Sequence, residues 1–265
     1  MRGQRLQRLS ASIDAFFSLG GAVEVHEDVH FVRNDALPRI HDANHGYAVR
    51  AVSRDAVRGV LERARERFGS PRTPFFYCDA LTPAAFEAQL ASEGYEATAT
   101  VELLLSGELE RGGSDVAIRE ARSDDDWRSV LELTRADHRE AAAREKRPPY
   151  DADVTEGLVA LRRARAPAVR TWLASSGRRD CAFVSSWPGS AGIGKVEDLF
   201  TRPDHRQRGI ATRLIAHGVA DARSRGAREV GIGARVGDTP VRMYAALGFE
   251  PVMLRRGWRR TDPTP

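Results

Sequence analysis

The chain has 265 residues, of which 42% are hydrophobic and 29% are charged, with a formal net charge of +4. This composition is typical of a folded globular protein, because disordered chains have fewer apolar residues and a larger net charge. At about 100–200 residues per domain, the length predicts two domains. No run approaches the roughly 18 consecutive apolar residues of a membrane span, and Asp14 interrupts the N-terminal apolar stretch. We therefore expect a cytoplasmic protein that does not bind membranes.

The charge pattern does not predict nucleic-acid binding. Arginines alternate with acidic residues along predicted helices, as in LERARERF and DARSRGARE, which is typical of solvated helix faces with local ion pairs. Nucleic acid is therefore not an expected partner. Cys78 and Cys181 lie far apart in apolar, strand-like runs, so we expect buried, reduced thiols and no disulfide or metal site.

The first half is expected to begin with an amphipathic helix, followed by a polar loop and a strand–helix–strand unit. The unit covers about 74–80, 82–94 and 97–105. Such loops are usually just hydrated, and the alternative interpretations are substrate contacts or metal ligands. The polar residues of the loop are Asn34, Asp35, Arg39, His41, Asp42, Asn44 and His45.

A polar, glycine-containing segment from Leu109 to Asp115 separates two strand-like runs. We place the domain boundary there, which predicts domains at 1–110 and 115–262. The second domain is expected to contain a strand, two helices, a three-stranded meander, a helix, a strand, a helix and a final strand. This order predicts a mixed α/β fold. The expected helices cover about 123–142, 152–165, 209–226 and 240–247, and the expected strands cover about 116–120, 168–175, 180–187, 194–202, 228–236 and 251–258.

The segment DLFTRPDHRQRGIATRLI leads from a predicted strand into a predicted helix. A helix N-terminus has unpaired backbone N–H groups and the positive end of the helix dipole. Gly209 and Ala211 would let a phosphate approach this backbone closely, and Arg206 and Arg208 add positive charge. The segment therefore predicts a pyrophosphate-binding site. A glycine that only ends a turn is the alternative interpretation.

This segment resembles the acetyl-CoA-binding signature of the GNAT superfamily of N-acetyltransferases, Arg/Gln-x-x-Gly-x-Gly/Ala after a β-strand. The stretch Tyr-x-x-x-Gly-Phe from Tyr244 to Phe249 resembles the last helix of that family and its exit. The resemblance covers Val116 to Arg260. It implies a mixed α/β fold with a splayed central sheet flanked by helices, acetyl-CoA as cosubstrate and no metal.

The resemblance also implies which residues bind acetyl-CoA. Backbone groups of Leu199 and Thr201 would bind the pantetheine arm, and the amides from Gln207 to Thr212 would bind the pyrophosphate. Asp238 stands where the family often has an Asn, so the sequence departs from the family pattern there. The implied cofactor-binding residues are Leu199, Phe200, Thr201, Arg206, Gln207, Arg208, Gly209, Ile210, Ala211, Thr212, Asp238 and Tyr244.

Tyr244 matches the usual general acid of the family, a phenol that protonates the leaving thiolate. The alternative is a ring that only packs in the core. Strand alternation places Glu197 on one face with Leu199 and Thr201, and Asp198 on the opposite face. Glu197 is the predicted general base. Lys195 at another common position of the base, a purely structural Glu197, and a water chain are the alternatives.

The predicted function is transfer of an acetyl group from acetyl-CoA to a primary amine of a small molecule, amino acid or peptide. A non-catalytic acyl-CoA-binding sensor or interaction module is the alternative. The resemblance implies that the acceptor site lies around Trp127 to Asp151 and Arg255 to Trp258. It does not identify the acceptor, and it leaves a homodimer open.

The first half lacks the cofactor signature. Its strand–helix–strand unit, with Pro83 and Gly94, is a weaker copy of the end of the chain, with Pro240 and Gly248. We therefore expect a duplicated, tandem arrangement in which residues 1–110 form a degenerate GNAT-like or accessory domain. Coincidence of two generic units is the alternative.

Overall fold

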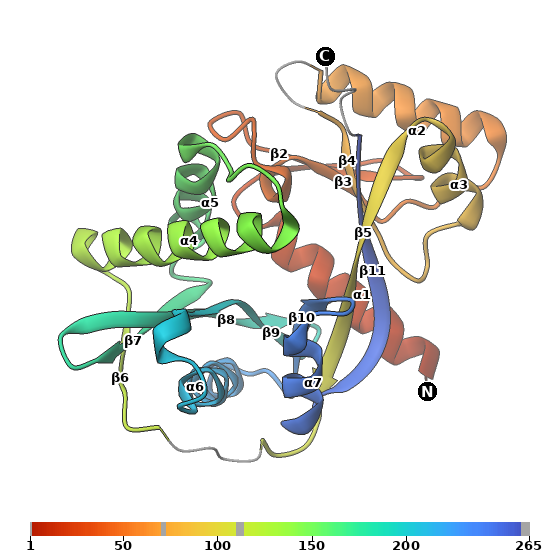
Figure 1. Cartoon of the computed structure of the whole chain (residues 1–265). Coiled ribbons are helices and arrows are strands. Elements are labelled where there is room, and N and C mark those ends of the chain that lie inside the picture. Colours follow the sequence, from red (N-terminus) through yellow and green to blue (C-terminus); the bar gives the residue numbers. More distant parts are fainter. Residues whose placement is uncertain (1, 70–72, 110–113, 261–265) are drawn as a thin grey trace. The chain divides into compact units, whose positions relative to one another are not determined.

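The computed structural model describes residues 2–69, 73–109 and 114–260 (Figure 1). The chain divides into two compact units, each built from segments that are separate in the sequence. The chain passes from one unit to the other inside β5 (Tyr95–Leu105), β10 (Glu229–Arg235), α7 (Thr239–Ala246) and β11 (Glu250–Arg260). The predicted linker Leu109–Asp115 lies mostly outside the described residues. The first unit contains Met1–Leu103, Gly233–Val241 and Pro251–Pro265, and the second contains Leu104–Ile232 and Arg242–Glu250.

The first unit contains a sheet in the order β1-β2-β3-β4-β11-β5. Its strands are β1 (Ala22–Val25), β2 (His30–Arg33), β3 (His45–Tyr47), β4 (Phe75–Cys78), β5 (Tyr95–Leu105) and β11 (Glu250–Arg260). Its helices are α1 (Arg2–Ser18), α2 (Arg54–Arg67), α3 (Ala84–Ser92) and the 3₁₀ turn η1 (His41–Ala43). The last strand of the chain, β11, runs antiparallel to β4 and lies between β4 and β5. Residues distant in sequence therefore complete this sheet.

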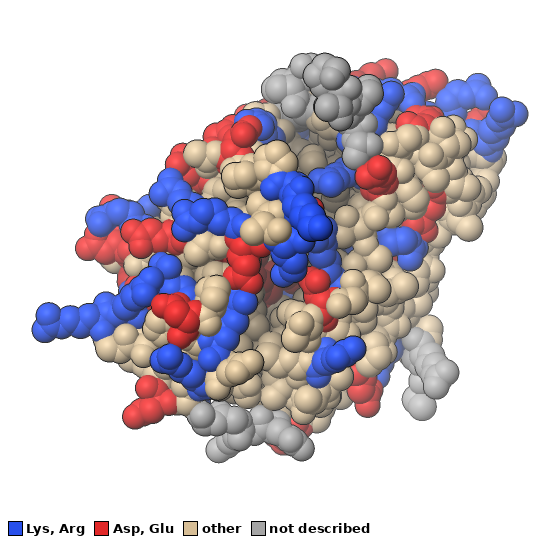
Figure 2. Space-filling view, in the orientation of Figure 1, with Lys and Arg blue, Asp and Glu red and all other residues tan. Residues whose placement is uncertain are grey.

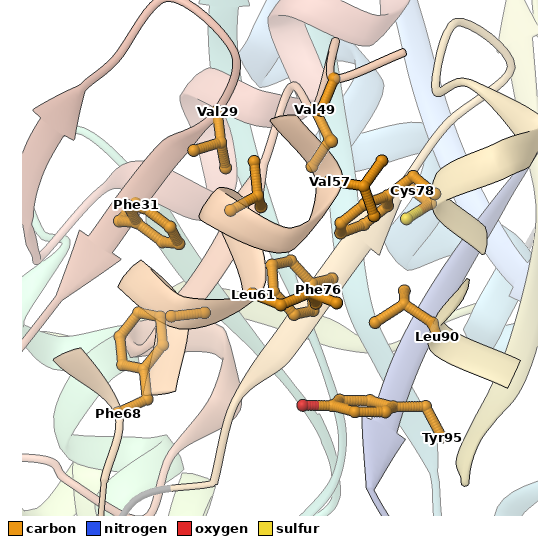
Figure 3. Packing of buried hydrophobic residues seen from close by; sticks show 14 residues of the cluster. Val29, Phe31, Val49, Val57, Leu61, Phe68, Phe76, Cys78, Leu90 and Tyr95 are labelled. Atoms are coloured by element: carbon orange, nitrogen blue, oxygen red, sulfur yellow. The ribbon is translucent and has the colours of Figure 1, made fainter. Parts of the chain in front are cut away.

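The core of the first unit forms around one face of α2 (Figure 3). Val57, Val60, Leu61 and Ala64 recur at helical spacing and are all buried. They pack with Phe76 of β4, which is completely buried. Burial of an aromatic side chain of this kind contributes about 2–3 kcal/mol to the free energy of unfolding.

The second unit contains a sheet in the order β10-β9-β8-β7-β6, in which only the β9–β10 pair is parallel. Its strands are β6 (Ala117–Glu120), β7 (Arg170–Ser176), β8 (Arg179–Ser190), β9 (Ile193–Thr201) and β10 (Glu229–Arg235). Its helices are α4 (Asp124–Glu145), α5 (Ala152–Ala164), α6 (Ile210–Ser224), α7 (Thr239–Ala246) and the 3₁₀ turn η2 (Pro203–His205). Figure 1 shows α4 and α5 on one face of β7–β9 and α6 on the other. The predicted mixed α/β fold is confirmed.

Two local features position the helices of the second unit. Helix α4 begins with a capping box between Ser123 and Asp126, in which each side chain binds the other residue's backbone N–H. Its apolar face then packs on β8 and β9 through Leu133, among others. On the opposite face, Gly218 of α6 lies so close to Val196 of β9 that an added Cβ would be 3.2 Å from that side chain. The glycine therefore permits close helix–sheet packing.

Within the described ranges, no helix combines the length and apolar character needed to cross a bilayer. Cys78 and Cys181 are buried and unpaired, as expected from the sequence. Cys78 lies in the core of the first unit. Cys181 of β8 donates a hydrogen bond to the carbonyl of Ala174 at 3.4 Å.

Candidate functional site

Strand β9 contains a bulge at Asp198. The ladder with β8 pairs Phe200 with Phe183 and Glu197 with Ser185, so β9 uses one more residue than β8 between these pairs. Asp198 has φ of 61°, a left-handed conformation that is uncommon for a residue with a side chain. Its carboxylate accepts a hydrogen bond from Ser185, which lies on the same side of the sheet as its register partner Glu197. The predicted placement of Asp198 on the face opposite Glu197 is therefore wrong.

The other edge of β9 is open near its end. In the described part of the chain, the ladder with β10 ends at Val196–Ile232, whereas β9 continues to Thr201. The N–H of Arg202 donates to the carbonyl of Cys181 on β8 at 2.8 Å. Because backbone groups alternate along a strand, those of Thr201 point to the open edge. Thr201 is one of the two residues, with Leu199, whose backbone groups would bind the pantetheine arm according to the family resemblance.

The entry to α6 presents backbone N–H groups. Gly209 is the N-cap with φ of 72°, and Gln207 has φ of 58°. Among the described residues, no side chain caps this helix. The free N–H groups and the helix dipole favour an anion, and successive N–H groups in such turns form a concave anion-binding nest. The segment therefore fits a phosphate group.

Helix α2 of the first unit begins differently. Its N-cap is Ser53, whose hydroxyl accepts a hydrogen bond from the N–H of Ala56 at 3.2 Å. The side chain thus satisfies an N–H group that an anion would otherwise bind. The first half lacks the cofactor-binding signature, and the start of α2, capped by its own side chain, agrees with that.

Replacing Ser53 by Ala is expected to lower the free energy of unfolding by about 1 kcal/mol, because an N-cap hydrogen bond is lost. Urea denaturation measures this change. The response of the protein to CoA should stay the same, since Ser53 caps a helix of the first unit. A lower CoA affinity in this variant would contradict a purely structural role of the cap.

Arg206 connects three elements of the second unit. Its two terminal nitrogens donate to the two carboxylate oxygens of Glu140 on α4, both at 2.7 Å. Its Nε donates to the carbonyl of Thr201 at 2.9 Å, and its guanidinium lies 5.9 Å from the ring centroid of Phe200. Sequence reasoning missed Glu140. Arg206 therefore holds the loop between β9 and α6 in place. Arg206 and Arg208 are both exposed.

The remaining predicted cofactor-binding residues differ in their exposure. The side chains of Phe200 and Ile210 are 4% and 3% exposed, so only their backbone groups are accessible to a ligand. Ala211 and Thr212 are half-buried on the first turn of α6. Asp238 directly precedes α7 in a segment that clusters with the first unit.

Tyr244 on α7 is 4% exposed. Burial raises the pKa of its phenol, and the carboxylate of Glu197 raises that pKa further. The phenol therefore stays protonated at neutral pH and can donate a proton. Glu197 itself lies 2.7 Å from the ammonium group of Lys195, which is 2% exposed. The two candidates for the general base thus form one ion pair.

Sequence reasoning also missed a polar cluster between α4, α5 and β9. Arg162 donates to Asp198 at 2.8 Å and to the hydroxyl of Thr134 at 3.1 Å. Burial alone would raise the pKa of Asp198, but Arg162 beside it holds that pKa below its usual value. Nearby, burial and Arg162 lower the pKa of His138 to about 4, and burial raises the pKa of Asp137 to about 6. The sequence signal that could have indicated this cluster is the group of three polar residues at 134, 137 and 138 of a predicted helix.

The polar loop of the first half is held by its own side chains. The amide of Asn44 donates to the carbonyl of Ile40 and accepts from the N–H of Asn34, both at 3.0 Å. The hydroxyl of Tyr77 donates to Asp42. In the residues that the structure describes, no group of three or more potential metal ligands gathers. These contacts favour a structural role for the loop.

The late acceptor segment expected from the sequence, Arg255 to Trp258, lies on β11. Arg255 is 7% exposed and donates to Glu102 at 2.7 Å, between the rings of Phe17 and Tyr77. Trp258 donates to Glu87 at 2.8 Å. These side chains bind partners within the sheet and helices of the first unit.

Figure 2 shows basic and acidic side chains mixed over the visible face. Many exposed arginines pair with nearby carboxylates, such as Arg135 with Glu156 at 2.8 Å. This distribution agrees with the solvated helix faces expected from the sequence.

Comparison with known proteins relates these features to a family. Residues 127–249 match the model of the acetyltransferase (GNAT) family. An uncharacterized N-acetyltransferase from Methanocaldococcus jannaschii is 33% identical over 82 residues, which cover 31% of this chain and 36% of that protein. The match thus spans only about a third of the length of this curated relative.

Solved structures extend the similarity in fold to nearly the whole chain. A GCN5-related N-acetyltransferase from Kribbella flavida has a TM-score of 0.72 at 14% identity, with coverage of 97% of this chain and 96% of that one. A tandem GNAT protein from the clavulanic acid biosynthesis pathway has a TM-score of 0.58 at 16% identity, with coverage of 89% and 79%. At these identities the likeness concerns the fold alone.

Proposed function

We propose that this chain, whose residues 127–249 belong to the acetyltransferase (GNAT) family, transfers an acetyl group from acetyl-CoA to a primary amine. The observation that carries the proposal is the uncapped entry to α6 directly after the open edge of β9. A strand edge with free backbone groups suits an extended amide-containing arm, and the helix entry suits a pyrophosphate. The pantetheine arm of CoA would thus bind along β9, and its pyrophosphate would bind at the start of α6.

The residues present fit acetyl-CoA. The backbone at Leu199 and the N–H of Thr201 would hold the pantetheine arm, since the carbonyl of Thr201 already accepts from Arg206. The N–H groups from Gln207 to Thr212 would hold the pyrophosphate, with Arg208 adding charge from the exposed side. Bound acetyl-CoA supplies an activated thioester carbonyl.

The chain then has to position the amine, remove a proton from its ammonium form and protonate the leaving thiolate. Tyr244 is our candidate for the last task because it matches the position of the family's usual general acid and its phenol is protonated at neutral pH. Glu197, in its ion pair with Lys195, is the base inferred from the sequence.

We assign catalysis to residues 115–262 and a supporting role to residues 1–110. The capped start of α2 supports this division, because it removes the anion-binding character that α6 retains. A sensor that binds acyl-CoA without turnover is the second candidate. The presence of a tyrosine at the family's general-acid position, Tyr244, favours the enzyme, because binding alone does not need a proton donor.

A thermal-shift titration with acetyl-CoA, CoA and ATP tests the proposal. Binding to the native state raises the apparent Tm, by an amount that corresponds to about 2.7 kcal/mol at a ligand concentration of 100 Kd. We expect a rise with both CoA species and little with ATP, followed by CoA thiol release when amines are added. An unchanged Tm with both CoA species would contradict the proposal, and binding without release from any amine would favour the sensor.

A further inference from the structure

Asp137 is a half-buried carboxylate on α4 to which the described residues offer no hydrogen bond or ion pair. Burial raises its pKa to about 6, and Glu140 and Asp198 add to the rise, whereas Arg162 and Arg144 act in the lowering direction. A carboxylate that is partly removed from water without a partner is unfavourable for stability. Such groups are over-represented at functional sites.

Two contacts define where Asp137 lies along β9. Thr134, one helical turn earlier, accepts from Arg162, which also binds Asp198 in the bulge. Glu140, one turn later, binds Arg206 just beyond the end of β9. Helix α4 therefore follows β9 from its bulge to its exit, and Asp137 lies between these two contacts.

This position is beside the open stretch of β9 that contains Leu199 and Thr201. Asp198 and Glu197 point to the same side of the sheet, toward α4 and α5. Arg162 already binds the carboxylate of Asp198, and Arg206 that of Glu140. Arg144 of α4, which also acts on Asp137 electrostatically, lies 3.9 Å from Glu145. A further cation from outside the chain would complete the charge balance at Asp137.

We propose that Asp137, in place of Glu197, binds the ammonium group of the acceptor and takes its proton, an inference that rests on the acetyltransferase function proposed above. Glu197 would then keep its ion pair with Lys195. The proposal rests on the position of Asp137 between the bulge of β9 and the start of α6. In the described part of the chain, no hydrogen bond or ion pair satisfies its carboxylate. The acceptor class is accordingly a primary amine that is protonated at neutral pH. Amides, alcohols and thiols lack the positive charge that this site would bind.

The ammonium loses one proton to the Asp137 carboxylate, and the freed amine lone pair forms a C–N bond with the acetyl carbonyl carbon. The C–S bond breaks with its electron pair on sulfur, and the thiolate takes a proton from Tyr244. The nitrogen, which carries a positive charge after its attack, releases its second proton to solvent as the amide forms. Before the next turnover Asp137 releases its proton to solvent and the Tyr244 phenolate takes one up, so that one proton is released per acetyl group transferred.

Asp137→Asn is the test variant, with Asp125→Asn as matched control, because Asp125 is on the same helix and pairs with Arg128 in solvent. Acceptors are found by CoA thiol release with putrescine, glucosamine and glycinamide. We expect Asp137→Asn to lower kcat/KM by about 10²-fold or more and the control to stay within about twofold. The thermal shift with CoA should be the same in both variants.

The pH profile separates a proton acceptor from a merely structural residue. The wild-type kcat/KM should fall below about pH 6, where Asp137 becomes protonated. Asp137→Asn should lose this limb, and Asp137→Glu should restore part of the activity. Near-wild-type kcat/KM in Asp137→Asn, or an unchanged acid limb, would overturn the proposal while leaving the acetyltransferase function intact.

The stability of the unliganded protein gives a second readout. The folded-state pKa of Asp137 is raised, so its ionised form lowers stability above the unfolded value of 3.8. Asp137→Asn should therefore raise the Tm by several degrees at pH 8 and leave it unchanged at pH 3.5. A lower Tm at pH 8 would mark a structural role instead. No CoA binding by the wild-type protein would contradict the proposed function itself and remove this inference with it.

Discussion

Replacing Tyr244 by Phe is expected to lower kcat for acetyl transfer by about 10²-fold or more, because a general acid contributes roughly 10²–10⁴ to the rate. The ring would still fill its buried position, so the fold should persist. Burial and Glu197 both raise the pKa of this phenol, so it is protonated at neutral pH. Steady-state thiol release and a CoA thermal-shift titration measure the two expected outcomes, reduced kcat and unchanged affinity.

Tyr95→Phe is the matched control for Tyr244→Phe. Tyr95 is also buried, at 6% exposure, but it belongs to the core of the first unit. Its replacement removes one phenol hydroxyl without touching the proposed site. Equal kcat values for the wild-type protein and Tyr244→Phe would rule out Tyr244 as the acid and would favour a solvent proton donor.

Replacing Gly209 by Glu is expected to raise the Kd for CoA by at least about 10²-fold, because the new carboxylate would repel the pyrophosphate at close range. A side chain at φ of 72° also costs about 1 kcal/mol of stability. Isothermal titration calorimetry with CoA measures the affinity, and circular dichroism reports on the fold.

Gly209→Ala separates the two effects of Gly209→Glu. It imposes the same backbone strain at φ of 72° without the charge. The Tm of the two unliganded variants should therefore be similar, whereas the Glu variant should bind CoA much more weakly. Equal affinities of both variants would show that the entry to α6 does not contact the pyrophosphate.

Local sequence patterns were sufficient to predict most elements of the second unit. The polar start and apolar periodicity of α4, and the glycine before α6, are local signals, and they led to correct helices. The GNAT resemblance was carried by the same local motif and is confirmed over residues 127–249.

Features that depend on pairing between distant segments could not be predicted in this way. The bulge at Asp198 is set by the register with β8, and an alternation rule does not anticipate an extra residue. The contact of Glu140 with Arg206 joins residues 66 positions apart, so no spacing pattern indicates it. The partial burial of Asp137, to which the described residues offer no hydrogen bond or ion pair, likewise depends on how α4 lies along β9.

The position of β11 has a consequence for how the protein is made. The sheet of the first unit needs β11 between β4 and β5, but β11 follows the elements from β6 to α7 in the chain and so leaves the ribosome after them. During synthesis the sheet of the first unit therefore lacks its strand between the hydrophobic strands β4 and β5. The segment from β6 to α6 is already available to fold at that stage. The nascent chain thus completes its first unit after most of its second, and a chaperone would be most useful during that interval.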